Sequence, residues 1–292
     1  MIVDPYKVQA RRLVDIALKE DLGGTISVEG DVTSRLIIPS AHQGQAAFAA
    51  RQKGVLAGIE VAEMVFASLD NSIQFRALRA DRQTIQAGDI IARVQGSIRS
   101  ILAAERTALN FLQHMSGIAT LTRQFVDAVV PLPTKILDTR KTIPGLRYLA
   151  KHAVLCGGGD NHRMGLNEVL IKDNHLAALR EHKHPIIAAI DAVRNGPVRG
   201  WTIEIEVDSL DQLDEALPAK PDIILLDNMP LDMMREAVRR RNAVAPEVLL
   251  EASGGVTLQT VRAIAETGVD RISVGALTHS APALDIALDY DA

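Results

Sequence analysis

Hydrophobic and polar positions alternate in short blocks along most of the chain after Pro133. Strand-like apolar runs lie at Lys135–Leu137, Val169–Ile171, Thr202–Val207, Asp222–Leu226, Val248–Leu250 and Arg271–Val274. Helical patterns lie between most of these runs, for example at Leu210–Leu217, Asp232–Asn242 and Leu258–Thr267. Strands that alternate with helices over this length predict parallel strands with crossover helices, in either a barrel or an open sheet.

The pattern is different before about residue 100. Apolar runs at Gln45–Ala50 and Asp89–Val94 lie among turn residues, and Ile59–Leu69 has helical spacing, which together predict a mixed α/β layer. From Ser100 to about Val130 the apolar residues again recur at helical spacing, but Gly117 interrupts them. Because glycine weakens a helix, this segment is expected to form either one helix or two helices that meet at Gly117.

Composition and charge narrow the class of protein. The 292 residues are 47% hydrophobic and only 3% aromatic, and the net charge of -4 argues against a general nucleic-acid-binding surface. The single cysteine, Cys156, excludes an internal disulfide and a cysteine-based zinc site, and we expect it to be a small buried side chain. We see no secretory signal in Met1–Ala10 and no apolar stretch of roughly 20 residues, so we expect no membrane span and a cytoplasmic location.

Polar residues follow the apolar runs of the second half at the point where each predicted strand ends. They are Asp138–Lys141, Lys172–His175, Glu206, Asp227 with Asn228, Glu251–Gly255 and Gly275. In (β/α) barrels the active site is built from the carboxyl ends of the strands. The sequence therefore predicts a ring of functional groups on one face.

Cations crowd into one segment of this otherwise acidic chain. They are Arg140, Lys141, Arg147, Lys151, His152, His162, Arg163, Lys172 and His175. Scattered lysines usually form a solvated surface. Several of these cations stand where strands end, however, and arginine and lysine suit carboxylates and phosphates. We therefore expect a pocket for a small polyanion.

The acids of two neighbouring strands suggest a metal site. Side chains alternate along a strand, so Glu204 and Glu206 lie on the same face, and Asp227 ends the next strand. Glu206 and Asp227 are suited to hold Mg²⁺, which binds through few carboxylates and bridges to phosphates. For Glu204 we expect a structural ion pair near the start of its strand.

Glycines in the last two predicted strand ends suggest a phosphate site. Ser253-Gly254-Gly255 and Gly275 allow backbone N–H groups to approach an anion, and barrel enzymes often bind a phosphate there. A phosphorylated substrate with a metal-bound pyrophosphate and an anionic partner fits all three features. We find no Walker-type loop, dinucleotide fingerprint or Ser-His-Asp arrangement.

Several longer motifs occur in an order that closely resembles the quinolinate phosphoribosyltransferase family. They are Glu105–Asn110, Ser116–Thr120, Asp138–Arg147, Gly157–Arg163, Ile171–His175, Leu226–Met229, Glu251–Gly255 and Gly275–Ser280. The resemblance extends from about Asp15 to Leu288. The segment from Arg163 to Lys172 is one residue shorter than the family norm, which is expected to alter the loop that carries Arg163.

The resemblance implies an activity and an architecture. The family makes nicotinate mononucleotide, pyrophosphate and CO₂ from quinolinate and phosphoribosyl pyrophosphate, with Mg²⁺, on the route to NAD. The implied fold is α/β: residues 1–112 with 277–292 form an α/β sandwich domain, and residues 113–276 form an open α/β barrel. The implied assembly is a homodimer in which each sandwich domain closes the partner's barrel.

The resemblance also implies roles for individual residues. The quinolinate carboxylates would be held by Arg140, His162, Arg163 and Lys172, with Arg106 supplied by the other subunit. The catalytic residues would be Lys141, facing phosphoribosyl pyrophosphate, and Glu206 and Asp227, which would also support Mg²⁺. The 5-phosphate would be surrounded by Ser253, Gly254, Gly255, Gly275 and His279.

Three alternatives stay open at this point. The chain could act on nicotinate or another heterocyclic acid, or be the molybdenum-associated homologue of this enzyme. It could also bind a phosphate or metabolite without catalysis. The intact segments Asp138–Lys141 and Lys172–His175 favour quinolinate over the first two.

Overall fold

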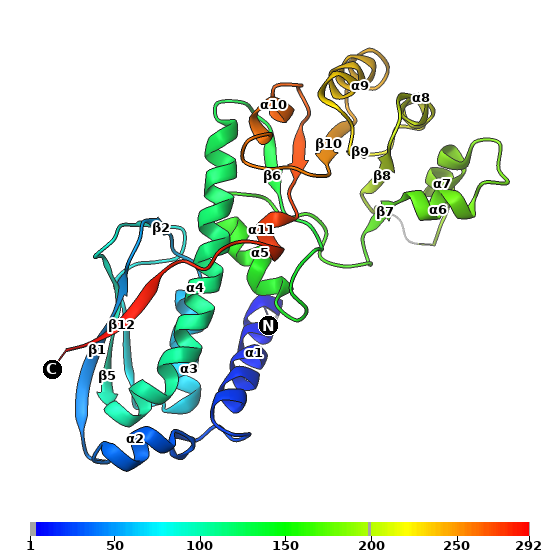
Figure 1. Ribbon diagram of the computed structural model, residues 1–292. Coiled ribbons are helices and arrows are strands. Elements are labelled where there is room, and N and C mark those ends of the chain that lie inside the picture. Colours follow the sequence, from blue (N-terminus) through cyan, green and yellow to red (C-terminus); the bar gives the residue numbers. More distant parts are fainter. Residues whose placement is uncertain (1–3, 198–199, 292) are drawn as a thin grey trace. The chain divides into compact units, whose positions relative to one another are not determined.

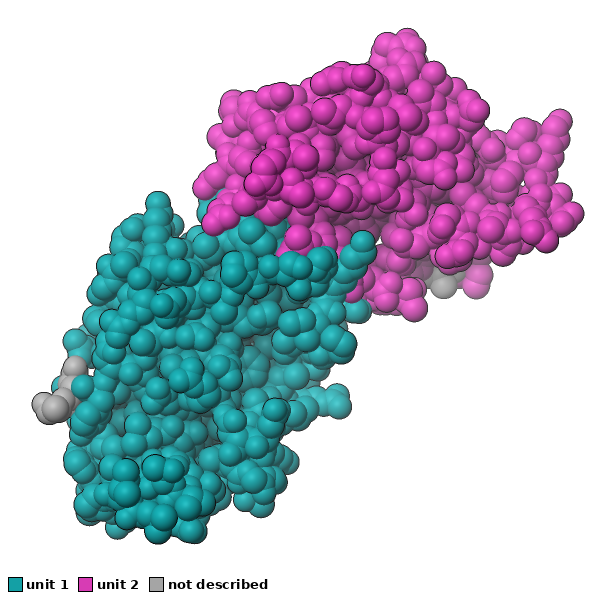
Figure 2. Space-filling view, in the orientation of Figure 1, with its two compact units in different colours: residues 1–123, 141–158, 277–292 teal, residues 124–140, 159–276 magenta. Residues whose placement is uncertain are grey.

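The computed structural model describes residues 4–197 and 200–291, which form two compact units. Unit 1 comprises residues 1–123, 141–158 and 277–292, and unit 2 comprises residues 124–140 and 159–276 (Figures 1 and 2). The predicted domains were residues 1–112 with 277–292, and residues 113–276. These domain boundaries stay a prediction.

Unit 1 contains an antiparallel sheet of four strands in the order β12-β1-β5-β3. These strands are β1 (Gln43–Ala50), β3 (Gln74–Ala77), β5 (Ile90–Ser97) and β12 (Ile286–Asp291). The short strands β2 (Gly54–Val55) and β4 (Thr84–Ile85) pair with each other. The two apolar runs predicted as strands in this region are confirmed as β1 and β5. Because β12 pairs with β1, the last strand of the chain completes a sheet that begins near its start.

The helices of unit 1 also contribute buried residues to its core. Those that begin in this unit are α1 (Pro5–Asp21), the 3-10 helix η1 (Val28–Gly30), α2 (Val32–Ile37), α3 (Ile59–Leu69), α4 (Ile98–Val129) and α5 (Arg147–Cys156). The predicted helix over Ile59–Leu69 is confirmed as α3. Phe66 of α3 packs against Phe48 of β1 and Phe75 of β3, with ring centroids 6.0 and 5.8 Å away. This aromatic cluster joins the helix to the sheet.

The alternative of two helices meeting at Gly117 is wrong, because α4 is a single continuous helix (Figure 1). The reason for the glycine is packing within unit 1. A Cβ on Gly117 would lie 2.0 Å from the carbonyl oxygen of Pro282 and 3.0 Å from Cα of Ala283. Gly117 thus lets the backbone before β12 lie directly against α4.

Unit 2 is built on a parallel sheet of six strands in the order β6-β11-β10-β9-β8-β7. The strands are β6 (Lys135–Leu137), β7 (Val169–Ile171), β8 (Ile203–Val207), β9 (Ile223–Asp227), β10 (Leu249–Ser253) and β11 (Arg271–Ser273). Each of the apolar runs predicted after Pro133 overlaps one of these strands, and β9 and β10 extend beyond their runs to Asp227 and Ser253. Among the described residues β6 and β7 form the two edges of the sheet and do not pair with each other.

Helices connect the strands of unit 2. They are α6 (Asp173–Ala178), α7 (Pro185–Arg194), α8 (Leu210–Ala219), α9 (Leu231–Val244) and α10 (Val261–Ala265), and α11 (Ala276–His279) leads from this unit into unit 1. Three of them, α8, α9 and α10, overlap the predicted helical segments. Within residues 4–197 and 200–291, no helix combines the length and the apolar character that crossing a lipid bilayer requires.

Candidate active site

The register of the parallel sheet brings several predicted site residues to one edge of unit 2. Ile171 pairs with Ile205, so Lys172 and Glu206 follow as neighbours on adjacent strands. On the next pair of strands, Asp227 pairs with Ser253. These residues stand at or near the carboxyl ends of their strands, where a barrel carries its active site.

Lys172 and Glu206 form an ion pair at this edge. The Lys172 Nζ atom donates to Glu206 Oε2 over 3.0 Å, and the Lys172 side chain is 46% exposed whereas that of Glu206 is 13% exposed. The Lys172 backbone N–H donates to Nδ1 of His175 at 2.9 Å, which fixes the start of α6. The ammonium group is therefore held beside the carboxylate and remains accessible to a ligand.

Glu206 and Asp227 line the same cavity, which has a volume of about 240 Å³ and also includes Asp173 on its wall. The Asp227 carboxylate accepts a hydrogen bond from the side-chain amide of Asn228 at 2.8 Å. Several carboxylates on one cavity supply the oxygen ligands that Mg²⁺ prefers. The donor set of this cavity therefore fits a magnesium ion.

The Ser-Gly-Gly turn after β10 adopts a backbone that only glycine adopts readily. Gly254 has φ +100° and Gly255 has φ +59°, both in the left-handed region. A Cβ on Gly254 would lie 2.1 Å from Oδ1 of Asn228, the residue whose side chain holds Asp227. The predicted phosphate turn is thus packed against Asn228, which holds one carboxylate of the acidic cavity. Gly275 immediately precedes α11.

Two of the predicted carboxylate-binding arginines lie close enough to repel each other. Burial lowers the pKa of Arg163, and the positive charge of Arg140 lowers it further. Arg163 Nη1 donates to the carbonyl oxygen of Glu168 at 3.0 Å, and the Met164 N–H donates to Glu168 Oε1 at 2.7 Å. Glu168 thus closes the loop that carries Arg163. Two like charges held together favour an anion between or beside them.

His162 is 9% exposed and is held on three sides. Its backbone N–H donates to Asp138 Oδ1 at 2.8 Å, and its Nδ1 accepts the Arg163 backbone N–H at 2.8 Å. Its Nε2 lies 3.1 Å from Glu204 Oε2 and 3.3 Å from Glu251 Oε1. Glu204 therefore has the structural pairing that we expected for it.

The protonation of this buried group is set by opposing demands. Burial lowers the pKa of His162 and its hydrogen bonds with Glu204 and Glu251 raise it, whereas the Arg163 N–H that Nδ1 accepts opposes a second ring proton. Burial also raises the pKa of Glu204, and the nearby Glu251 adds to the rise. In the observed geometry Nδ1 of His162 accepts a backbone N–H, so the ring proton faces the carboxylates from Nε2. A second ring proton would break the bond to Arg163.

The remaining predicted residues belong to unit 1. Arg106 is exposed on α4, the Lys141 carbonyl accepts a hydrogen bond from Thr278 Oγ1 at 2.7 Å, and His279 Nδ1 lies 2.6 Å from Ser280 Oγ. The predicted roles of Arg106, Lys141 and His279 stay predictions.

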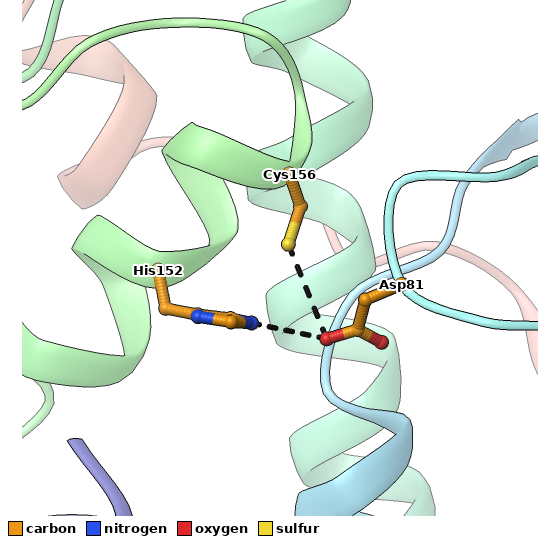
Figure 3. A group of neighbouring side chains, drawn as sticks. All are labelled: Asp81, His152 and Cys156. Carbon is orange, nitrogen blue, oxygen red and sulfur yellow. Dashed lines mark hydrogen bonds and ion pairs between the residues drawn. The ribbon is translucent and has the colours of Figure 1, made fainter. Parts of the chain in front are cut away.

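A second cluster of polar side chains lies in unit 1 and comprises Asp81, His152 and Cys156 (Figure 3). Their potential ligand atoms lie within 4.8 Å of one another. The Asp81 carboxylate accepts the backbone N–H groups of Gly58 and Ile59 at 3.0 Å, the start of α3, as well as His152 Nε2 at 3.0 Å. The buried Cys156 thiol, as predicted a small core side chain, reaches the same carboxylate at 4.0 Å. These hydrogen bonds account for the cluster, which is structural.

The sequence placed Glu251 among the polar residues at strand ends but gave it no partner, and it did not single out Arg271. Glu251 is fully buried and pairs in register with Arg271, whose Nε lies 3.1 Å from Glu251 Oε2. The available signal was weak: Glu251 stands two positions before Ser253 and so shares its face of β10.

In unit 1, nothing in the sequence links Asp81 to His152, since 71 positions separate them.

Comparison with known proteins identifies the family. The model of the quinolinate phosphoribosyl transferase C-terminal domain matches residues 118–289, and that of the N-terminal domain matches residues 31–116. A nicotinate-nucleotide pyrophosphorylase [carboxylating] of Mycobacterium leprae is 45% identical over 283 residues, 96% of each chain. Quinolinate phosphoribosyltransferase [decarboxylating] 1 of Nicotiana glauca is 43% identical and covers 96% of this chain and 81% of its own.

The solved structures agree with the sequences. The nicotinate-nucleotide pyrophosphorylase of Francisella tularensis has a TM-score of 0.89 and 39% identity, over 99% of this chain and 98% of its own. This similarity, with the parallel sheet of unit 2 and the antiparallel sheet of unit 1, confirms the predicted open α/β barrel and α/β sandwich. From the two matched domains and these relatives, this chain belongs to the quinolinate phosphoribosyltransferase family.

Proposed function

We propose that this protein transfers the phosphoribosyl group of phosphoribosyl pyrophosphate to quinolinate, with loss of CO₂, in NAD biosynthesis. The observation that carries the proposal is the carboxyl edge of the unit 2 sheet. There Lys172, Glu206, Asp227 and Ser253 stand on consecutive strands. The relatives named for this reaction support it.

The quinolinate pocket is assigned to the cations of unit 2. Arg140 and Arg163 repel each other and would be relieved by a dicarboxylate, and the exposed ammonium of Lys172 offers a further contact. His162 stands behind Arg163 as part of the same group. Arg106, supplied by the second subunit of a homodimer, would complete the clamp.

The phosphoribosyl pyrophosphate side is assigned to the acidic cavity and the glycine turn. Glu206 and Asp227 would hold Mg²⁺, which supplies positive charge against the departing pyrophosphate. Lys141 would add a second positive charge there. The 5-phosphate would lie at Ser253, Gly254 and Gly255, with Gly275 and His279, because backbone N–H groups at such turns bind anions.

The chemistry needs positioning and charge rather than a protein nucleophile. The bond between the anomeric carbon and pyrophosphate breaks as the quinolinate nitrogen bonds to that carbon. The ribose gains positive charge in this step, and the carboxylates of Glu206 and Asp227 offset it. The pyridinium then accepts the electron pair of the carbon–carbon bond to the adjacent carboxylate, which leaves as CO₂, and the same ring carbon takes up a proton from water. A cytoplasmic location is part of the proposal.

The test is product formation by the purified protein with phosphoribosyl pyrophosphate, Mg²⁺ and either quinolinate or nicotinate. We expect nicotinate mononucleotide and pyrophosphate only with quinolinate. Turnover with nicotinate alone would overturn the substrate assignment. Calorimetric binding of quinolinate without any product would favour a binding protein over an enzyme.

A substitution at Glu206 tests whether this residue acts in turnover rather than in quinolinate binding. Replacing Glu206 with Ala should lower kcat by about a hundredfold or more, because charge stabilisation in the transition state is lost. Quinolinate affinity should change much less. An exposed acid of the same unit, replaced as Glu181→Ala, is the control. Unchanged turnover in the Glu206 variant would remove Glu206 from the mechanism.

A further inference from the structure

We infer that Glu204 and Glu251 are positioning residues that hold the two clamp arginines in place through His162. The inference rests on the proposed function and assigns to the buried interior of unit 2 a part in quinolinate binding. It concerns a group of four side chains, called here the interior strut. They are His162, Glu204, Glu251 and Arg271.

His162 connects the strut to both arginines. Its Nδ1 accepts the backbone N–H of Arg163, which fixes the peptide from which the Arg163 side chain extends. Its own backbone N–H donates to Asp138, a fully buried carboxylate two positions before Arg140 at the end of β6. A displacement of His162 would therefore disturb both clamp residues, Arg163 through the imidazole and Arg140 through the backbone contact with Asp138.

The imidazole is in turn fixed from the inside of the sheet. Nε2 faces Glu204 of β8 and Glu251 of β10, at 3.1 and 3.3 Å. The two strands lie on either side of β9, so the carboxylates grip the ring from separate strands. Rigid strands hold such contacts more precisely than a loop does, and the 160–163 segment is a loop that needs this support.

The burial of the strut argues that its charges are there for a purpose other than stability. The side chains of Glu251, Glu204 and His162 are 0%, 5% and 7% exposed, and Arg271, at 18%, neutralises Glu251. Buried ion pairs are weak sources of stability because removing charges from water is costly. We infer that these buried charges instead hold a ligand-binding group in one orientation.

The experiment measures quinolinate and phosphoribosyl pyrophosphate binding separately, by calorimetry on the purified full chain. In Glu251→Gln, the amide keeps the shape of the side chain and removes its charge. We expect the quinolinate dissociation constant to rise about tenfold or more, because a charge-assisted contact is lost. The dissociation constant of phosphoribosyl pyrophosphate with Mg²⁺ should stay within about twofold, since the ion pairs described for the strut involve none of its assigned ligands.

Glu251→Gln leaves Arg271 without its neutralising carboxylate, so a second and a third variant guard against misfolding. The double variant Glu251→Gln with Arg271→Gln removes opposite charges together, and Glu204→Gln leaves the Glu251–Arg271 pair intact. Both should show the same selective loss of quinolinate binding. Glu181→Gln, an exposed acid of the same unit, is the matched control and should bind both ligands normally.

Three results would overturn the inference. Folded variants that bind quinolinate as the unaltered protein does would show that the strut does not position the clamp. Equal weakening of both ligands would show general loss of structure instead. Failure of the unaltered protein to bind quinolinate at all would overturn the proposed function, and the inference with it.

Discussion

His152 shows how one partner decides the charge of a residue. It lies between the ring of Tyr6, stacked at a centroid distance of 4.2 Å, and the Asp81 carboxylate at 3.0 Å. Burial lowers the pKa of His152, but the hydrogen bonds with Asp81 and Cys156 outweigh this and raise it to about 9. The imidazolium and the carboxylate together hold α5 to the loop that begins α3.

This contact predicts a loss of stability at alkaline pH. Below pH 6.5, the ordinary pKa of histidine, His152 is protonated in both the folded and unfolded states, and the ion pair contributes fully. As pH rises through about 9, the folded protein loses this proton and the contribution disappears. Urea unfolding at pH 6 and at pH 10 measures how far the free energy of unfolding falls between the two. This fall should be smaller for His152→Gln than for the unaltered protein, by about 1–3 kcal/mol.

The control for this titration is the exposed His182, as His182→Gln, which should follow the unaltered protein at each pH. Identical pH profiles for His152→Gln and the unaltered protein would mean that the pair contributes nothing measurable.

Single residues were predictable from the sequence where position along a strand determined their surroundings. Lys172, Glu206, Asp227 and Ser253 could be assigned to one edge, because parallel strands end together. The partners of His162 could not be assigned in this way. The contacts of His162 with Glu204 and Glu251 depend on how the loop before β7 folds against the sheet. No local sequence pattern predicts that.

At the scale of elements, apolar periodicity predicted the strands of unit 2 and the helix α3. It failed at α4, where the glycine signal was read as a possible break. The helix continues because its neighbour, the backbone at Pro282 and Ala283, needs the space that a side chain would fill. The short helices α6 and α7 and the N-terminal α1 were not predicted, since turn residues and charges obscure their periodicity.

The close approach at Gly117 predicts a stability change opposite to helix propensity. In an exposed helix, replacing glycine with alanine stabilises by up to about 1 kcal/mol. Here the new Cβ would lie 2.0 Å from the Pro282 oxygen, so Gly117→Ala should destabilise by about 1–3 kcal/mol. Thermal unfolding of the two proteins measures the difference.

Gln124→Ala, at an exposed position of the same helix, should be neutral or slightly stabilising. A Gly117→Ala protein that unfolds at a higher temperature than the unaltered one would contradict the packing argument.

At the scale of the whole molecule, the proposed homodimer can be tested by mixing two inactive variants. If Arg106 serves the partner's site, an Arg106→Ala subunit paired with a Lys172→Ala subunit restores one intact site, because both changes then fall in the other site. Mixing the two inactive variants after reversible dissociation should restore about a quarter of the normal activity, since half of the dimers are mixed and each has one working site of two.

Each variant mixed with itself is the control and should stay inactive. No recovery in the mixture, with subunit exchange verified by mass spectrometry, would place Arg106 in the site of its own subunit.

The pairing of β12 with β1 has a consequence for biosynthesis. During translation β1 leaves the ribosome long before β12, with every strand of the parallel sheet synthesised between them. Until β12 emerges, β1 is an unpaired sheet edge in the nascent chain, and such edges can pair with other chains. The parallel sheet of unit 2, in contrast, has all its strands before this point. The sheet of unit 1 can therefore be completed only once β12 has been made, after the segment inserted within unit 1.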